Sequence, residues 1–420
     1  MNNLRKRVLR DVDVTNKTVI CHLDLNVLIH NHQIVNDKRI RASMATLSYL
    51  INHNAKVVVI SHLGRINTLE DKTSGKNSLR IVADTLARKL KRLGATVTFS
   101  PENTGDNVVA LVKELKPKDV LILENTRYCD VNEKGEYVGL EWLASAKLGK
   151  FWASLGDIFI EDAFGVAHRL LASNYQTASH SKESAIGFSI INETNHIDLA
   201  LDLPKRPYLA LLGGNRVTDK IDVIEVICQR ADNVIIGGGI VFTFLHVQGF
   251  DVGLNLVEKE AIEDCKQILN NYGNKITLCF DFLCNNDFSD TRPIYRKIDE
   301  NLDGLYALDI GKRSLKIIKR AIKHAQTILW NGPFGVIENI KYYAQGTTEI
   351  IKAVAKQADK GAYTIISDID TSNHAEFLGL DKRINFISSG GGASLAYIAE
   401  SVLHGIDPIE DQPIKRHVYK

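Results

Sequence analysis

Cationic and hydrogen-bonding side chains follow several short apolar runs in the first half of the chain. They are Asp24, Asn26, His62, Arg65, Arg127, His168 and Arg169, and Arg39 lies in a charged segment just before a helical pattern. Arginine forks match the geometry of phosphate and carboxylate groups, and Asp24 and Asn26 could accept hydrogen bonds from a hydroxyl group. One such residue alone would indicate only a turn or a solvated surface. Because they recur after four apolar runs, they predict a binding site for a small hydroxy acid that carries a phosphate.

Glycine-rich segments follow apolar runs in the second half at three places, 213–214, 237–239 and 390–392. Glycine lets backbone amides and a helix N-terminus approach phosphates or a purine closely. A single pair of glycines would indicate only a tight turn, but three such segments favour a nucleotide site. The P-loop pattern and the dinucleotide-binding pattern are both missing. Arg216 and Lys220 begin a helical pattern after the first segment and are candidate phosphate ligands.

Acidic and amide side chains complete the candidate nucleotide site. Asn331 ends one apolar run, with Glu338 shortly beyond it, and Asp370 and Thr371 follow the next run. Mg²⁺ is usually held by one or two carboxylates together with phosphate oxygens, so Asp370 is the candidate magnesium ligand. Glu338 could accept hydrogen bonds from ribose hydroxyls, although a single glutamate is most often solvated. The expected co-substrate is a nucleotide that carries Mg²⁺.

Short apolar runs alternate with longer amphipathic patterns along almost the whole chain, and they predict the elements that position these side chains. The expected strands are 18–23, 56–61, 96–99, 120–125 and 157–160, then 208–212, 234–236, 276–280, 327–330, 363–367 and 384–388. Strands that alternate with helices form parallel sheets. This number of strands is too large for one compact sheet. We therefore predict an α/β protein of two Rossmann-like, three-layer domains with parallel sheets, joined by a hinge helix.

The domain boundary is predicted between the two series of strands. We expect an N-terminal domain over residues 1–185, a hinge or spacer helix over 186–205, a C-terminal domain over 206–400 and a tail over 401–420. Ligands of open parallel sheets bind beyond the carboxyl ends of the strands. The basic residues of the first half should therefore share one rim, and the glycine-rich segments of the second half another.

Composition excludes several other classes of protein. The 420 residues carry a formal net charge of +2, which is too near neutrality for a nucleic-acid or membrane-surface protein. No run reaches the ~18 apolar residues of a membrane span, and the N-terminal segment lacks the apolar core of a signal peptide. None of the six cysteines forms a C-x-x-C pair. We expect a cytoplasmic protein with reduced thiols that binds neither nucleic acid nor membrane.

Eight motifs, spread in order from about residue 18 to about residue 400, resemble those of the phosphoglycerate kinase family. They are DLN at 24–26, SHLGR at 61–65, LENTR at 123–127, DAFGVAHR at 162–169, GGNRVTDK at 213–220, GGGIVFTFL at 237–245, WNGPFGVIE at 330–338 and SGGGAS at 389–394. A run of eight motifs in this order is highly specific.

The resemblance implies a glycolytic kinase that reversibly transfers the acyl phosphate of 1,3-bisphosphoglycerate to MgADP, giving 3-phosphoglycerate and ATP. It implies that 3-phosphoglycerate is held by Asp24, Asn26, Arg39, His62, Arg65, Arg127, His168 and Arg169. The nucleotide and its metal would be held by Gly214, Lys220, Gly238, Gly239, Asn331, Glu338, Asp370 and Thr371. Arg39, Arg216, Gly391 and Gly392 would act at the transferred phosphoryl group. The family is mostly monomeric and its C-terminal tail returns to the N-terminal domain, so both are expected here.

The chain departs from the family pattern at four places. Arg216 stands where the family has lysine, and Ser367, Asp368 and Ile369 replace three glycines before Asp370 and Thr371. Around DLN, His22 replaces an arginine and Leu28 a proline, and before DAFG, Glu161 replaces an asparagine. The first two departures fall in the region of phosphoryl transfer, while the last two are nearer the fold than the chemistry.

The replaced glycines leave two functions open. Ile369 cannot easily adopt a positive φ, and Asp368 would repel the transferred phosphoryl group unless it faces solvent or binds Mg²⁺. At ~4 Å and an effective dielectric constant of about 20, that repulsion is roughly 4 kcal/mol. The alternative hypothesis is a degenerate homologue that binds 3-phosphoglycerate and nucleotide with little catalysis and serves a regulatory role. We favour the active enzyme because every basic residue of the 3-phosphoglycerate site is present.

Overall fold

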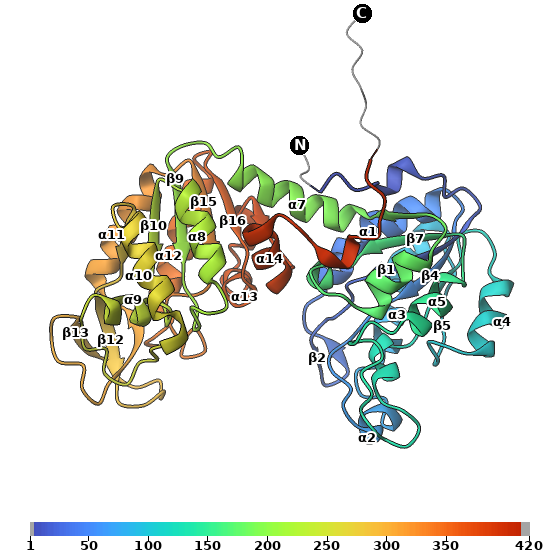
Figure 1. The fold of residues 1–420 in the computed structure, drawn as a ribbon, viewed down its shortest axis with the longest axis horizontal. Helices are drawn as coiled ribbons and strands as arrows, with labels where there is room; N and C mark the ends of the chain where they lie inside the picture. Colours follow the sequence, from blue (N-terminus) through green and yellow to red (C-terminus); the bar gives the residue numbers. More distant parts are fainter. Residues whose placement is uncertain (1–3, 413–420) are drawn as a thin grey trace, which may run out of the picture. The chain divides into compact units, whose positions relative to one another are not determined.

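The computed structural model describes residues 4–412, which divide into two compact units. Of these residues, 4–194 and 401–412 belong to the first unit, and 195–400 form the second. The division falls within helix α7 (Phe188–Leu201), which is green in Figure 1. Each unit is built on a six-stranded sheet in which every neighbouring pair of strands is parallel. The predicted fold class is confirmed.

The sheet of the first unit has the strand order β5-β6-β4-β1-β7-β8. Its strands are β1 (Thr18–Leu23), β4 (Lys56–Ile60), β5 (Val97–Phe99), β6 (Val120–Ile122), β7 (Ile158–Asp162) and β8 (Ser184–Ile186). β1 and β4 are nearly continuous apolar runs and are almost wholly buried, as expected for parallel strands covered on both faces. β8 was not predicted because Ser184–Ile186 has only three residues and lacks a long apolar run.

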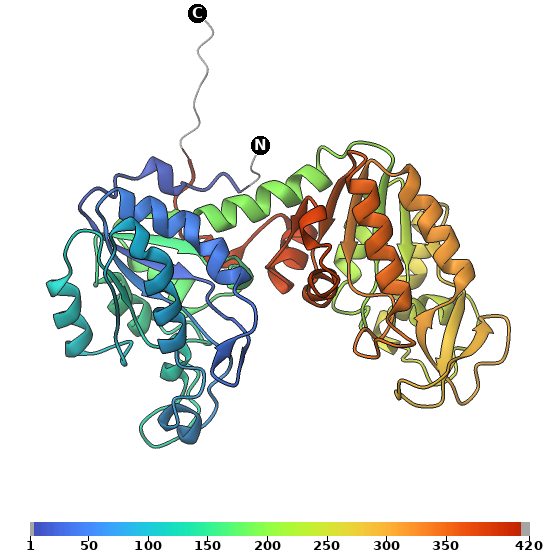
Figure 2. The same cartoon turned by 180° about the vertical axis from the view of Figure 1, so that it is seen from behind.

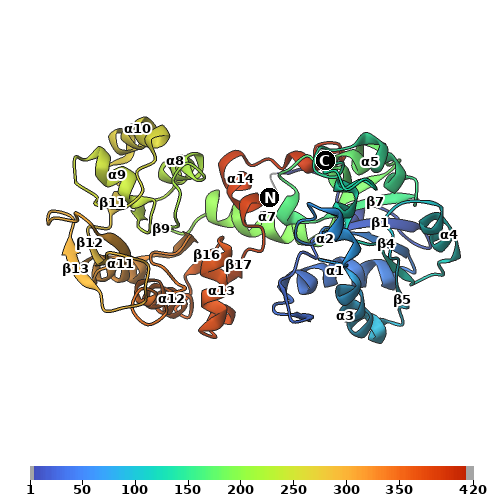
Figure 3. The ribbon, with the colours of Figure 1, turned by 90° about the horizontal axis from the view of Figure 1, so that it is seen from below.

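Helices cover both faces of this sheet. The helices of this unit that precede α7 are α1 (Lys38–Asn52), α2 (Leu69–Thr73), α3 (Arg80–Leu90), α4 (Asp106–Glu114), α5 (Ala146–Ala153) and α6 (Thr177–His180). Figure 3 shows α1 and α3 on one face of the sheet and α5 on the other. Leu47, Leu50 and Ile51 of α1 are fully buried, because residues three and four positions apart share one side of a helix. They pack in one core cluster with Val57 and Val59 of β4.

The sheet of the second unit has the strand order β11-β10-β9-β15-β16-β17. Its strands are β9 (Tyr208–Leu212), β10 (Asn233–Ile236), β11 (Ile276–Leu278), β15 (Thr327–Asn331), β16 (Tyr363–Ile366) and β17 (Phe386–Ile387). The helices of this unit are α8 (Ile221–Arg230), α9 (Val241–Val247), α10 (Ile262–Tyr272), α11 (Lys312–His324), α12 (Gln345–Ala358), α13 (Ile369–Phe377) and α14 (Gly392–Glu400). Figure 3 shows α8, α9 and α10 on one face and α11 and α12 on the other.

Two small antiparallel sheets lie outside the predicted pattern. One joins β12 (Asp281–Asn285), β13 (Ile294–Lys297) and β14 (Tyr306–Ile310), and it is drawn in yellow and orange in Figure 2. The other is a hairpin of β2 (Ile29–His30) and β3 (Gln33–Ile34). β2, β3 and β13 are short or partly exposed, and polar residues limit the apolar runs of β12 and β14, so the pattern of a buried strand is missing.

The C-terminal segment is anchored within the first unit. Asp411 pairs with Lys6 in an antiparallel bridge, and the Arg7 N–H donates to the Glu410 carbonyl at 2.8 Å. The Lys6 ammonium also lies 3.0 Å from the Asp411 carboxylate. Residues 413–420 of the predicted tail lie outside the described residues. Among residues 4–412, no helix has the length and apolar character needed to span a membrane.

Candidate functional site

The strand order of each sheet determines where a ligand site can form. In the first unit the chain moves outward from β1 in one direction through β4 and in the other through β7. In the second unit the corresponding reversal lies between β9 and β15. Ligands of open α/β sheets bind at such a switch point, beyond the carboxyl ends of the strands. Most of the predicted residues stand in the segments that follow strands of these sheets.

A chain of hydrogen bonds joins four segments at the rim of the first unit. The Arg39 guanidinium donates to the Asp24 carboxylate at 2.9 Å and to the Asn26 carbonyl at 3.1 Å. The Asn26 side-chain oxygen accepts from the Gly64 N–H at 2.9 Å, and the Gly64 carbonyl accepts from Arg127 at 2.7 Å. Arg39 lies in the first turn of α1 rather than before the helix, because α1 begins at Lys38.

Two histidines of this rim are held in the neutral form. Burial, followed by the charges of Arg127, His22, Arg39 and Arg169, holds the pKa of His62 well below its ordinary value. Burial and the Arg169 charge lower the pKa of His168 to about 4. Nε2 of His168 accepts a hydrogen bond from Arg169 at 3.1 Å, so its proton lies on Nδ1. Neutral imidazoles can donate one hydrogen bond here without adding charge to a cationic site.

Three arginines gather at this rim, and the charges of Glu141 and Asp130 only partly offset the effect of burial on Arg127. Among the described residues, no ion pair involves Arg65, Arg127 or Arg169. Burial, and in part the neighbouring arginines, lower the pKa of both Arg127 and Arg169. One oxygen of the neighbouring Asp24 is buried and accepts no hydrogen bond from a described residue. Clustered cations beside a free carboxylate oxygen suit a ligand that carries both an anionic group and a hydroxyl.

Trp142 is a residue of this rim that sequence reasoning missed. The guanidinium carbons of Arg127 and Arg169 lie over its ring, 5.5 and 4.8 Å from the centroid. It lies in a turn shortly before α5, where the local sequence has no periodic pattern or motif that could have identified it.

Two of the departures from the family pattern form a single contact. His22 of β1 and Glu161 of β7 are both fully buried, and Nδ1 of the histidine lies 2.7 Å from the glutamate carboxylate. Burial alone would lower the pKa of His22, but the Glu161 charge raises it above its ordinary value. The second Glu161 oxygen accepts from the Ala163 N–H at 2.9 Å. The two substitutions therefore compensate one another, because each buried side chain supplies a partner for the other.

Lys220 is the central cation at the rim of the second unit. Its ammonium donates to the Gly213 carbonyl at 2.8 Å, and burial lowers its pKa. A Cβ atom at either Gly214 or Gly332 would lie 2.7 Å from that nitrogen, and both glycines have a positive φ. Only glycine leaves room for the lysine at these two positions. The loops after β9 and β15 thus form a narrow cradle around one positive charge.

The other glycine segments pack against this cradle. A Cβ atom at Gly238 would lie 2.6 Å from the Pro333 carbonyl oxygen, and one at Gly239 would lie 3.0 Å from the Asn215 carbonyl oxygen. Gly391 lies against Ile369, and Gly392 begins α14. The Asn331 amide donates to the Ser367 carbonyl at 3.0 Å, while its buried side-chain oxygen accepts from no described residue.

The charges of three carboxylates, Asp368, Asp219 and Asp370, act on Lys220. Burial, followed by the charges of Asp368 and Glu338, raises the pKa of Asp370. Within the described residues, no cluster of three or more acidic, histidine or cysteine side chains could by itself hold a metal ion. An exposed carboxylate whose ionised form is opposed by neighbouring charges suits a divalent cation that phosphate oxygens also coordinate. The donor set at Asp370 therefore fits Mg²⁺ that arrives with a nucleotide.

Asp368 caps helix α13. Its carboxylate accepts hydrogen bonds from the N–H and the hydroxyl of Thr371, both at 2.8 Å. Neither Asp368 nor Ile369 has a positive φ, so the β-branched side chain is accommodated without backbone strain. The segment that replaces three glycines is a regular helix start.

Arg216 is held beside the cradle by a buried carboxylate. Its Nε lies 3.6 Å from Glu258, whose side chain is 5% exposed, while the arginine side chain is 58% exposed. Its terminal nitrogen donates to the Thr218 hydroxyl at 3.4 Å. This exposed guanidinium remains available to an incoming anionic group.

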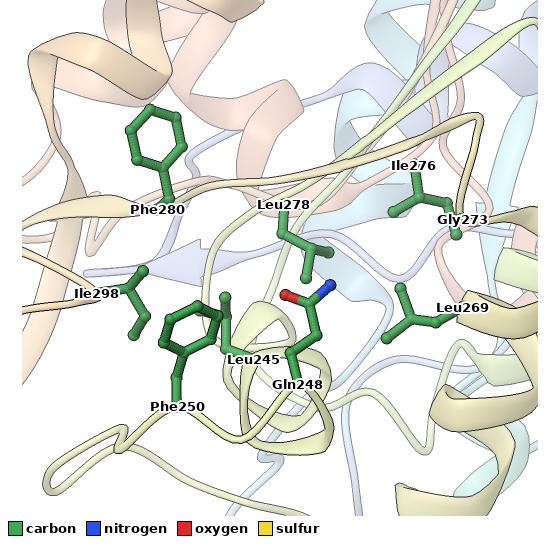
Figure 4. Close-up of a pocket in the computed structure, with 9 residues that line it drawn as sticks. All are labelled: Leu245, Gln248, Phe250, Leu269, Gly273, Ile276, Leu278, Phe280 and Ile298. Carbon is green, nitrogen blue, oxygen red and sulfur yellow. The ribbon is translucent and has the colours of Figure 1, made fainter.

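A cavity of about 300 Å³ lies elsewhere in the second unit. Figure 4 shows its lining, which comes from α9, α10, β11, the segments that follow them, and Ile298 after β13. The lining side chains are apolar except for the amide of Gln248. No predicted site residue belongs to it, and it offers no charge for a phosphate.

The fold and the two rims together define an α/β phosphotransferase built on two parallel sheets, one rim rich in arginine and the other formed by glycine loops around a lysine. The family model for phosphoglycerate kinase matches residues 9–401. The chain belongs to the phosphoglycerate kinase family.

Individual relatives are similar over nearly the whole chain. The phosphoglycerate kinase of Ureaplasma parvum serovar 3 is 65% identical over 416 residues, which cover 99% of each chain. That of Mycoplasmoides gallisepticum is 41% identical and covers 98% of this chain and 100% of its own. The solved structure of phosphoglycerate kinase from Coxiella burnetii has a TM-score of 0.79 at 30% identity, covering 96% of this chain and 98% of its own.

Proposed function

We propose that this chain catalyses the reversible transfer of the acyl phosphate of 1,3-bisphosphoglycerate to MgADP, which yields 3-phosphoglycerate and ATP. The enzyme is a phosphotransferase with a carboxyl group as acceptor, in keeping with its family. The observation that carries the proposal is the cluster of Arg65, Arg127 and Arg169 beside the free oxygen of Asp24. Its chemistry matches an acid that carries both a phosphate and a hydroxyl group.

In the first unit, the proposed binding residues divide the substrate between them. Arg65, Arg127 and Arg169 bind the phosphate of 3-phosphoglycerate, and Asp24 accepts a hydrogen bond from its hydroxyl. Arg39, which donates to Asp24 at 2.9 Å, binds the carboxyl group that accepts the phosphoryl group. His62 and His168, both neutral, and Asn26 complete the polar lining.

In the second unit, the glycine loops and Lys220 bind the nucleotide. Lys220 neutralises phosphate charge, Gly214, Gly238, Gly239, Gly391 and Gly392 give backbone access, and Asn331, Glu338 and Thr371 supply polar contacts. Asp370 holds Mg²⁺, which supplies charge neutralisation at the phosphates when bound. Arg216 stabilises the charge that develops on the transferred group. Its guanidinium is exposed and is held in place by Glu258.

The same proposal includes the organisation of the chain. The 3-phosphoglycerate domain comprises residues 1–185, a spacer helix follows over 186–205, the nucleotide domain comprises 206–400, and the tail 401–420 returns to the N-terminal domain. We further propose a cytoplasmic monomer, in keeping with a formal net charge of +2 and the family's usual state. The degenerate alternative has no support in the geometry, because Asp368 and Ile369 form an ordinary helix start.

The test is a coupled assay of the purified protein with 3-phosphoglycerate and MgATP, run beside calorimetric titration of each ligand. Turnover at ordinary kinase rates, on the order of 1 to 1,000 s⁻¹, is the expected result. Binding of 3-phosphoglycerate without turnover would overturn the proposed catalysis. Titration with ATP in the presence and absence of Mg²⁺ tests the metal, and Asp370→Asn should remove the difference.

A further inference from the structure

The aromatic ring of Trp142 lies beside two arginines that form no ion pair with a described carboxylate. The guanidinium carbon of Arg169 lies 4.8 Å from the ring centroid and that of Arg127 lies 5.5 Å from it. A cation over the face of an indole is attracted by the negative electrostatic potential of that face. The N–H donors of a guanidinium lie in its own plane, so stacking leaves them available to a ligand.

Trp142 is attached to the segment that carries each arginine. On one side, the Asp130 carboxylate accepts from the Glu141 N–H at 2.7 Å and from the Trp142 N–H at 3.3 Å. Asp130 ends the short helix Thr126–Asp130 that carries Arg127. These two hydrogen bonds therefore hold the backbone of Trp142 close to the short helix that carries Arg127.

On the other side, Glu141 attaches this loop to the segment after Arg169. The Ala172 N–H donates to the Glu141 carbonyl at 3.0 Å, and the Ser173 N–H donates to the Glu141 carboxylate at 3.0 Å. The side chain of Glu141 is only 1% exposed, whereas Trp142 is 40% exposed. A buried anchor therefore holds an accessible ring at the rim of the site.

We propose that Trp142 is a positioning residue for the phosphate-binding arginines, and that its ring keeps Arg127 and Arg169 oriented toward 3-phosphoglycerate while the site is empty. This inference rests on the proposed function of the same site. A carboxylate in this position would also hold the arginines, but it would compete with the substrate for their donors. An aromatic face attracts the cations without using those donors.

The test compares three substitutions with a neighbouring control. In Trp142→Ala and Trp142→Leu, the dissociation constant and KM for 3-phosphoglycerate should rise about 5- to 20-fold, because each cation–π contact contributes about a factor of 2 to 5. kcat and KM for ATP should change less than about two-fold. Trp142→Phe keeps an aromatic face and should restore most of the affinity. The control Leu143→Ala removes the next side chain of the loop, which is 73% exposed, and should bind as wild type.

Tryptophan emission gives a second readout that a purely structural role would not produce. The chain has three tryptophans, and Trp152 and Trp330 are fully buried. Addition of 3-phosphoglycerate alone should change the emission of wild type, and Trp142→Phe should abolish that change.

Each outcome decides the inference. Wild-type affinity in Trp142→Ala would overturn it, and so would full affinity in Trp142→Leu, since bulk rather than the aromatic face would then suffice. An emission change that survives in Trp142→Phe would also overturn it. If one of these results is found and the wild-type protein still turns over normally, the proposed function stands. A wild type that fails to bind 3-phosphoglycerate overturns both.

Discussion

The cap at the start of α13 gives a prediction whose size can be worked out from the structure. Asp368→Ala removes two hydrogen bonds of 2.8 Å, one from the N–H and one from the hydroxyl of Thr371. Loss of an N-cap carboxylate costs about 0.5–2 kcal/mol. The Thr371 side chain is fully buried, so its hydroxyl would also lose its partner, at a cost of about 1–3 kcal/mol. We expect a decrease of about 2 kcal/mol in the free energy of unfolding.

Two matched variants separate the cap from the charge. Asp368→Asn keeps a preferred N-cap residue and removes the negative charge, so its stability should stay within about 0.5 kcal/mol of wild type. Asp370→Ala removes a carboxylate from the same turn whose ionised form is opposed by burial and by its acidic neighbours. It should also leave the free energy of unfolding nearly unchanged.

The assay is unfolding in urea followed by circular dichroism, with each variant compared to wild type at one pH. The midpoint should fall for Asp368→Ala alone. If Asp368→Ala unfolds as wild type does, the cap contributes nothing. If Asp368→Asn loses as much stability as Asp368→Ala, the negative charge rather than the N-cap is responsible, and the stabilising role of the cap is refuted.

Three further expectations test the site. Arg216→Ala should lower kcat far more than it raises the dissociation constant of 3-phosphoglycerate. Arg216→Lys is the matched variant. An unchanged kcat in steady-state kinetics would remove Arg216 from the mechanism. Lys220→Met should weaken ADP binding by about 10- to 150-fold in calorimetry, because a charge-assisted hydrogen bond is worth about 1.5–3 kcal/mol. Binding of 3-phosphoglycerate by the first unit should not change. An ADP affinity equal to that of wild type would contradict the role of Lys220 as a phosphate ligand. The pKa of His168 falls from 6.5 to about 4 on folding, so between these values the unfolded state binds more protons and stability falls as the pH is lowered. His168→Gln should lose less stability over that interval, and parallel pH profiles in urea titrations would contradict this.

The strands and their order in the chain could be predicted from local pattern. Runs such as Val57–Ile60 and Tyr208–Leu212 are apolar over their whole length, because both faces of a parallel sheet are covered. The polar residue that follows each run could be predicted for the same reason. The antiparallel strands β12 to β14 could not, since β13 is partly exposed and polar residues such as Asp281, Asn285 and Asp309 limit the apolar runs of β12 and β14.

The capping role of Asp368 lies within reach of local reasoning, because Asp is a preferred N-cap residue. Comparison with a glycine-rich family motif instead favours an interpretation in which Asp368 and Ile369 disturb a phosphate contact. The structure corrects that interpretation, since neither residue has a positive φ and the carboxylate is engaged by Thr371.

By itself, the sequence determined the α/β class, the family and the residue types that stand at each strand end, because strand formation and short motifs depend on neighbouring residues. Only the tertiary structure decided which of those side chains meet. His22 and Glu161 are 139 positions apart and form one buried contact, and Trp142 joins two arginines from separate segments. Such contacts depend on strand order and loop path, and the periodicity of a single segment contains no information about either.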